Sequence, residues 1–221
     1  MFRQIRELLF GDPHIVFACD GQNHKSHVEG DINVMASEIE HQTYFTELEA
    51  VICGIFNTLP IEEQPLYIAD MGCGDGSLLR KIYEIVQTKS ARGSVLDRHP
   101  LILIGIDYNE KSLAATGHNL SKLPHLLLQG DIANPQRLLS DLQKHGIQDP
   151  KDILHVRSFL DHDRLFHPLE DEEAAKRREG LGYSGIYVTP NGQSICAAEA
   201  VQCLVEHLSR WKGIVSKLSL G

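Results

Sequence analysis

The stretch that decides the fold reads Asp70-Met71-Gly72-Cys73-Gly74-Asp75-Gly76. It follows an apolar run, Leu66 to Met71, of the kind that forms a strand buried on both faces, and it opens a helix-like segment near Ser77. Glycines permit backbone angles and close approaches that a Cβ atom would forbid. A glycine loop in this context predicts a ligand held against the backbone at the carboxyl edge of a parallel sheet.

The pattern of the loop bears on the identity of the ligand. A dinucleotide loop reads G-x-G-x-x-G, whereas here the third glycine comes one place early and Ser77 stands in its position. Asp70 and Asp75 flank the loop, and two carboxylates there would repel a phosphate but suit a cationic amino group. We therefore expect S-adenosylmethionine, which carries an ammonium and a sulfonium and no phosphate. A dinucleotide ligand and a purely structural glycine turn are the alternatives.

Further apolar runs alternate with helix-like segments along the chain. Leu101 to Ile106, Leu126 to Leu128 and Ile153 to Val156 are separated by predicted helices over 110–120 and 135–145. This alternation predicts right-handed βαβ units, and hence an α/β, Rossmann-like parallel sheet with helices on both faces.

Two further acids stand at the ends of predicted strands. Asp107 ends the second strand, where a carboxylate can accept both ribose hydroxyls, and Asp131 follows the third, where a carboxylate can take the adenine amino group. Their neighbours Tyr108 and Ile132 are assigned to the same cofactor site. Either acid alone could simply cap the next helix. Three acids at one edge of one sheet favour the cofactor role, which we expect for Asp70, Asp107 and Asp131 together with Gly72, Gly74 and Gly76.

Length and composition bound the organisation of the chain. The 221 residues have room for one domain and an extension. We place an N-terminal extension, with an amphipathic helix over about 36–57, at residues 1–60 and the cofactor-binding core at residues 61–221. The net charge of −9 argues against a duplex nucleic-acid binder, which needs a basic face.

The sequence also bears on where the protein works. No apolar run approaches the roughly 20 residues needed to span a bilayer, so we expect no membrane association. The five cysteines are widely spread and form no C-x-x-C pair, which favours a reducing cytoplasm over a disulfide framework.

These motifs resemble those of class I S-adenosylmethionine-dependent methyltransferases. Three stretches, Tyr67 to Gly76, Ile153 to Arg164 and His41 to Phe45, look more narrowly like the C-methyltransferase domains of bacterial polyketide synthases, over most of the chain from about residue 10. The resemblance implies methyl transfer to the α-carbon of an acyl thioester, with an acyl carrier protein or neighbouring synthase domains as partners. Some relatives use a bound metal, either divalent or iron-type, to polarise the acceptor carbonyl.

The acceptor side should lie in the segment that follows the fourth strand. Ser158 opens this segment and is assigned to the cofactor site, while His162 is the candidate general base because an imidazole titrates at about pH 6.5. His162 could instead ligate a metal that stabilises the enolate, and Asp161 could orient it or share that metal. The alternative is a polar loop. His155, inside the apolar strand, is interpreted as a satisfied core histidine.

The family fold has more strands than this sequence offers. A complete class I methyltransferase sheet has seven strands, whereas four apolar runs end here by Val156, and after a predicted helix over 197–211 only residues 213–221 remain for one more. We expect an incomplete sheet whose fourth strand lies at or near an open edge with an uncovered apolar face. The chain would then be a fragment of a longer synthase or be completed by another polypeptide. A cofactor-binding module without turnover and a small-molecule methyltransferase outside any synthase are the alternatives to the carrier-dependent enzyme.

Overall fold

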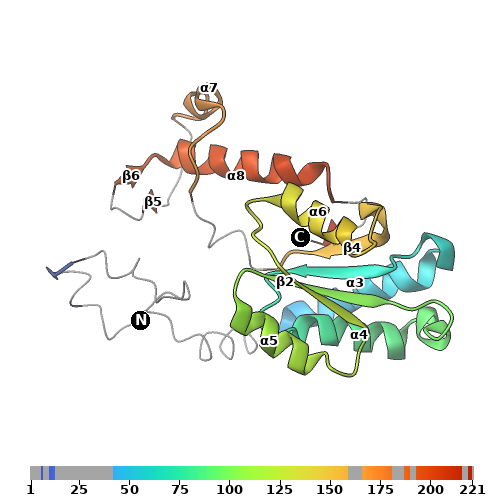
Figure 1. Ribbon diagram of the computed structural model, residues 1–221. Helices are drawn as coiled ribbons and strands as arrows, with labels where there is room; N and C mark the ends of the chain where they lie inside the picture. The colour runs from blue at the N-terminus through green and yellow to red at the C-terminus, as the bar shows by residue number, and fades with distance from the viewer. Residues whose placement is uncertain are drawn as a thin grey trace. The chain divides into compact units, whose positions relative to one another are not determined.

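The computed structural model describes residues 6, 10–12, 42–158, 166–180, 187–189, 193–215 and 219–220 (Figure 1). The chain divides into two compact units. One comprises Met1–Ala36 and Asp161–Arg210, and the other comprises Ser37–Leu160 and Trp211–Gly221.

The unit of Ser37–Leu160 and Trp211–Gly221 contains a parallel sheet. Within the described residues the sheet has five strands in the order β3-β2-β1-β4-β7. The strands are β1 (Tyr67–Met71), β2 (Ile102–Asp107), β3 (His125–Gln129), β4 (Ile153–Val156) and β7 (Ser219–Leu220). Each neighbouring pair is parallel, so the carboxyl ends of the strands meet at one edge, as expected from the alternating apolar runs.

Helices cover both faces of this sheet. On one face lie α3 (Gln42–Thr58) and α4 (Ser77–Lys89), whose apolar side chains pack with Ile68, Leu103 and Leu154. On the other face α6 (Pro135–Lys144) packs with Ala69, Ile104 and Ile153. Successive residues of a strand therefore enter opposite cores, which is why these strands read as continuous apolar runs. The predicted α/β fold is confirmed. The helix α3, which we assigned to an N-terminal extension, packs in the same compact unit as the sheet.

The expectation of an uncovered apolar face on the fourth strand is wrong, whereas its expected position near an edge of the sheet is confirmed, since β7 alone lies beyond it among the described strands. The strand β7 pairs with β4 through His155–Ser219 and Val156–Leu220, and all four residues of β4 are buried. Trp211 and Ile214, which precede β7, belong to the core that contains Ile153. The residues after the last helix thus supply the single strand expected of them, and they also cover the apolar face of β4.

Four described elements lie wholly or mostly in the other unit. They are the short helix α7 (Glu172–Lys176), the antiparallel pair β5 (Tyr187–Val188) and β6 (Ser194–Ile195), and most of α8 (Ala197–Lys212). The carboxylate of Glu206 in α8 accepts hydrogen bonds from the backbone N–H groups of Glu170 and Asp171, at 3.0 and 2.9 Å, and so ties the start of α7 to α8. No described helix is long and apolar enough to cross a membrane.

Candidate cofactor site

The glycine loop joins β1 to α4 at the carboxyl edge of the sheet. Gly72, Gly74 and Gly76 all have positive φ, of 76°, 56° and 79°, a region that residues with a Cβ atom rarely adopt. The backbone N–H groups of Gly72 and Cys73 donate to the carbonyl of Ile106 at 2.8 and 3.0 Å, so the loop is fastened to the end of β2. The three glycines of the motif are therefore required by the backbone path itself.

Asp107 lies at the end of β2 beside this loop. One carboxylate oxygen accepts the N–H of Gly74 at 3.1 Å, and the other accepts the N–H of Asn109 at 2.9 Å. The side chain is 8% exposed, and burial raises its pKa. The cap of the next helix, α5 (Glu110–Asn119), is Asn109, whose side chain accepts the N–H of Lys111. Asp107 is thus not the helix cap that we considered as its alternative role.

Asp70 is the second buried acid of the site. It is 3% exposed, and burial, with a smaller contribution from the charge of Asp107, raises its pKa to about 8. Among the described residues no basic side chain is paired with either acid. Two carboxyl groups in a poorly solvated place without a counter-ion form a site that a cationic ligand would stabilise.

Asp75, the other acid that flanks the loop, has local hydrogen-bond partners. Its carboxylate accepts the backbone N–H of Ser77 at 3.0 Å and the Ser77 hydroxyl at 2.8 Å, and Asn119 lies 3.4 Å from it. An aspartate so close to a helix start is drawn to the free N–H groups of the first turn. These contacts hold the carboxylate of Asp75 at the start of α4, beside the glycine loop.

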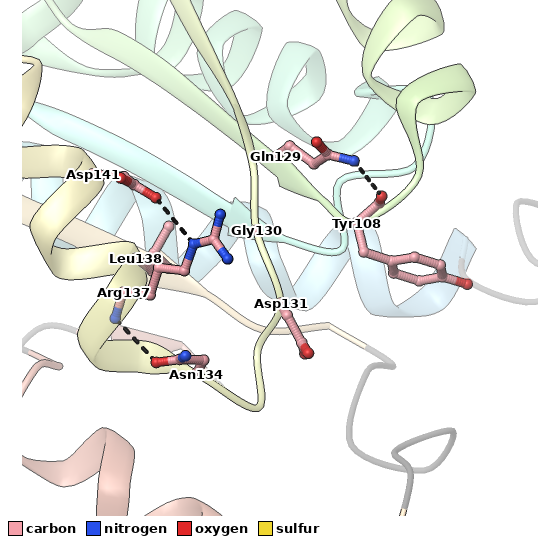
Figure 2. A pocket seen from close by; sticks show the side chains of 8 residues that line it. All are labelled: Tyr108, Gln129, Gly130, Asp131, Asn134, Arg137, Leu138 and Asp141. Carbon is pink, nitrogen blue, oxygen red and sulfur yellow. Dashed lines mark hydrogen bonds and ion pairs between the residues drawn. The ribbon is translucent and has the colours of Figure 1, made fainter. Parts of the chain in front are cut away.

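A pocket of about 320 Å³ opens between the ends of β2 and β3 and the start of α6 (Figure 2). Its lining includes Tyr108 and Asp131, which we assigned to the cofactor, with Gln129, Gly130, Asn134, Arg137, Leu138 and Asp141. Tyr108 is 58% exposed. Asp131 accepts the N–H of Ala133 at 2.8 Å, whereas the cap of α6 is Asn134. Asp131, like Asp107, is therefore not a helix cap, and it faces a space where a ring can lie.

Ile132 is held by the core instead of projecting into this pocket. Its side chain packs against the core that contains Trp211, and its carbonyl accepts the indole N–H of Trp211 at 2.9 Å. The guanidinium carbon of Arg157 lies 4.6 Å from the centre of the same indole ring. The loop after β3 and the residues after β4 are thus joined through one buried aromatic side chain.

Of the three residues expected on the acceptor side, the structure describes Ser158. Ser158 is half-buried and directly follows Val156 and Arg157 at the end of β4, beside the strand that leads into the glycine loop. Asp161 and His162 lie outside the described residues. Within the described part of the chain no three His, Cys, Asp or Glu side chains gather to hold a metal ion.

His155 is buried as predicted but is not satisfied. Neither ring nitrogen has a hydrogen-bond partner among the described residues, and burial, with a contribution from Arg157, lowers its pKa to about 4. The ring packs edge-on against Trp211, 6.4 Å between centres. The imidazole is therefore neutral at pH 7.

Two residues of α5 contact the glycine loop that sequence reasoning did not single out. Thr116 donates its hydroxyl to the carbonyl of Gly74 at 2.9 Å, and Asn119 donates its amide to the carbonyl of Asp75 at 2.8 Å. The available signal was a threonine between Leu113 and Leu120, on the apolar face of a predicted helix, where a polar side chain needs a partner.

Comparisons with known proteins agree with this geometry. The family model of the AprA MT2-like domain matches residues 25–221. Small RNA 2'-O-methyltransferases of Mus musculus and Rattus norvegicus are each 36% identical to the chain over 77 residues, which is 34% of this chain. The matched part is 15% of the length of these relatives.

Proposed function

The chain belongs to the AprA MT2-like family of methyltransferase domains, and from this premise we propose that it binds S-adenosylmethionine and methylates the α-carbon of a carrier-bound acyl thioester. The family is one of class I S-adenosylmethionine-dependent methyltransferases related to the methyltransferase domains of polyketide synthases. The carrier-bound acceptor and the residue roles given below are our proposal.

One observation carries the assignment of the cofactor site. Asp70 and Asp107 are buried together beside a glycine loop and have no basic partner among the described residues. A phosphate-bearing ligand would add negative charge beside these two carboxyl groups. A ligand with an ammonium and a sulfonium would instead favour their ionised, negatively charged form. The residues present therefore fit S-adenosylmethionine.

Each assigned residue has a role in this proposal. Asp107 accepts the ribose hydroxyls with the lone pairs that Gly74 and Asn109 leave free. Asp70 stabilises the cationic end of the ligand, and the pocket beside Tyr108 and Asp131 receives the adenine ring. The bound cofactor supplies an electrophilic methyl group.

The acceptor must become nucleophilic at carbon. We propose His162 as the base that removes the α-proton, oriented by Asp161, after which the α-carbon forms its bond to the methyl group as the bond from sulfur to methyl breaks. As an alternative, we propose that His162 holds a metal ion that would stabilise the enolate. Most of the rate would come from the alignment of acceptor carbon, methyl group and sulfur.

Calorimetry followed by a transfer assay tests the proposal. We expect S-adenosylmethionine to bind, NAD to show no binding, and radiolabelled methyl to appear on malonyl- or β-ketoacyl-carrier protein. Binding without transfer to any acceptor would favour a cofactor-binding module, and transfer to a free small-molecule acceptor alone would favour an enzyme outside a synthase. Preferential binding of NAD would overturn the cofactor assignment.

A further inference from the structure

Both backbone polar groups of Gly74 form hydrogen bonds with side chains. Its N–H donates to a carboxylate oxygen of Asp107 at 3.1 Å, and its carbonyl accepts the hydroxyl of Thr116 at 2.9 Å. Thr116 lies in α5 and is fully buried. The proposed ribose acceptor and this threonine are therefore connected through the backbone of a single residue of the glycine loop, by the two peptide groups that meet at Gly74.

A second polar contact extends the chain of hydrogen bonds. The Thr116 oxygen lies 3.3 Å from the sulfur of Cys73, and because the Thr116 proton is directed to Gly74, the thiol is the donor in this contact. Burial raises the pKa of Cys73 to about 12, so the thiol keeps the proton that it donates. One turn of α5 further on, Asn119 donates to the carbonyl of Asp75 at 2.8 Å. Three consecutive loop residues, 73–75, are thus held by side chains of one helix.

The methyl group of Thr116 makes an equally close fit. A Cβ atom added at Gly76 would come within 2.8 Å of the Thr116 methyl carbon, and one added at Gly105 within 3.1 Å of it. The helix can approach the loop and β2 this closely because both positions are glycine. The two groups of the Thr116 side chain therefore have different roles. The hydroxyl orients the carbonyl of Gly74, and the methyl group packs against Gly76 and Gly105.

We propose that Thr116, assisted by Asn119, is a positioning residue of the cofactor site, which fixes the backbone of Gly74 through its carbonyl so that the N–H of the same residue orients Asp107 toward the ribose. The inference rests on the proposed function for its ligand. It adds to that function a residue that has no contact with the ligand and that acts through the loop.

Two variants of Thr116 separate positioning from packing. Thr116→Val keeps the shape and removes the hydroxyl, so the Gly74 carbonyl loses its donor. We expect S-adenosylhomocysteine to bind about tenfold more weakly by calorimetry, which is the effect of one hydrogen bond of ordinary strength. Thr116→Ser keeps the hydroxyl and loses the methyl, so we expect a lower urea midpoint with affinity within about twofold of the wild type. Asn119→Leu should weaken binding in the same direction as Thr116→Val.

Thr88 offers a matched control. Its hydroxyl also donates to a backbone carbonyl, that of Glu84 at 2.7 Å, but it is exposed on α4. Thr88→Val should leave both affinity and stability unchanged. The inference is overturned if Thr116→Val binds S-adenosylhomocysteine as tightly as the wild type, or if Thr116→Ser loses as much affinity as Thr116→Val.

Hydrogen exchange of the free protein gives a readout that needs no ligand. Thr116→Val should speed exchange of the amides of residues 72–77 relative to the wild type, and Thr116→Ser should not. If the wild type binds neither S-adenosylmethionine nor S-adenosylhomocysteine, the proposed function fails, and this exchange experiment still decides whether Thr116 orders the loop. Equal exchange in all three proteins would show that it does not.

Discussion

Asp70 lies in β1, one residue before the strand ends, and has an acid–base behaviour unlike that of an ordinary carboxyl. Burial, reinforced by the charge of Asp107, raises its pKa from 3.8 to about 8. The folded protein therefore keeps a proton on this group at pH values where the unfolded chain has released it. Stability contributed in this way is complete below about pH 3.8 and is lost as the pH rises through about 8.

The pH dependence of unfolding tests this behaviour. We expect the free energy of unfolding of the wild type to fall between pH 7 and about 8.5, above the range in which His155, whose pKa is lowered to about 4, affects it. Asp70→Asn removes the titration and should flatten the slope in urea titrations. Asp97→Asn, at a side chain that is 76% exposed, is the control. A wild-type slope retained in Asp70→Asn would contradict the assignment.

Asp107 has a role that binding measurements isolate. Asp107→Ala should weaken S-adenosylmethionine binding by about 1–3 kcal/mol, because the ribose hydroxyls lose a charged acceptor. Calorimetry of Asp107→Ala beside Asp97→Ala measures the difference. Unchanged affinity in the first variant would remove Asp107 from the site.

The sequence predicted the acidic residues of the site better than the residues that hold the glycine loop by hydrogen bonds. Asp70, Asp107 and Asp131 could be placed because parallel strands bring their carboxyl ends to one edge. The local partner of Asp75 was not predicted, because a motif does not reveal that a carboxylate two residues before a helical N–H accepts that N–H. For Thr116 the sequence offered only a polar side chain on an apolar helix face, and its partner could not be foreseen because the contact with Gly74 joins residues 42 positions apart.

Among the elements, the segment between α4 and β2 carries the most unusual buried group. Arg92, in the 3-10 helix Ala91–Val95, is fully buried and donates to the carbonyls of His99 and Pro100 and to the side chain of Gln64. Gln64 in turn donates to the carbonyls of Phe56 and Leu59 at the end of α3. The segment between α4 and β2 therefore ties α3 to the start of β2.

Loss of Arg92 should destabilise the protein substantially. We expect Arg92→Ala to lower the free energy of unfolding by about 2–4 kcal/mol, because the buried Gln64 side chain and two partly buried carbonyls lose their donor. Arg98→Ala, at a side chain that is 72% exposed, should change it by less than about 0.5 kcal/mol. Urea titration of both variants measures this, and equal stability of the two would show that Arg92 has no such role.

The long elements were predictable and the short ones were not. Strands β1, β2 and β4 are continuous apolar runs, and α4 begins at Ser77 as the end of the glycine loop indicates. By contrast β6 and β7 have two residues each and exist through pairing with a partner strand, so they leave no periodicity to detect.

For the molecule as a whole, net charge bears on the choice of acceptor. The related enzymes of Mus musculus and Rattus norvegicus are named for small RNA, whereas this chain has a net charge of −9. Since RNA binding draws on phosphate neutralisation, we expect no retardation of a small RNA duplex by about 10 µM protein at physiological salt. A gel shift that weakens as salt is added would count against this expectation and would favour an RNA acceptor.

The burial of β4 depends on residues far along the chain, which local sequence patterns did not reveal. The order β3-β2-β1-β4 follows from right-handed crossovers between apolar runs. The cover over β4 comes from Trp211, Ile214 and β7, more than 50 residues later, and could not be inferred from β4 itself.

Trp211 is the only tryptophan in the sequence. It is 2% exposed, its indole N–H donates a hydrogen bond to the carbonyl of Ile132, and its ring lies against the guanidinium of Arg157. The tryptophan fluorescence of the protein therefore originates where the loops that follow β3 and β4 meet. An unlabelled sample reports events there through the wavelength and intensity of its tryptophan emission.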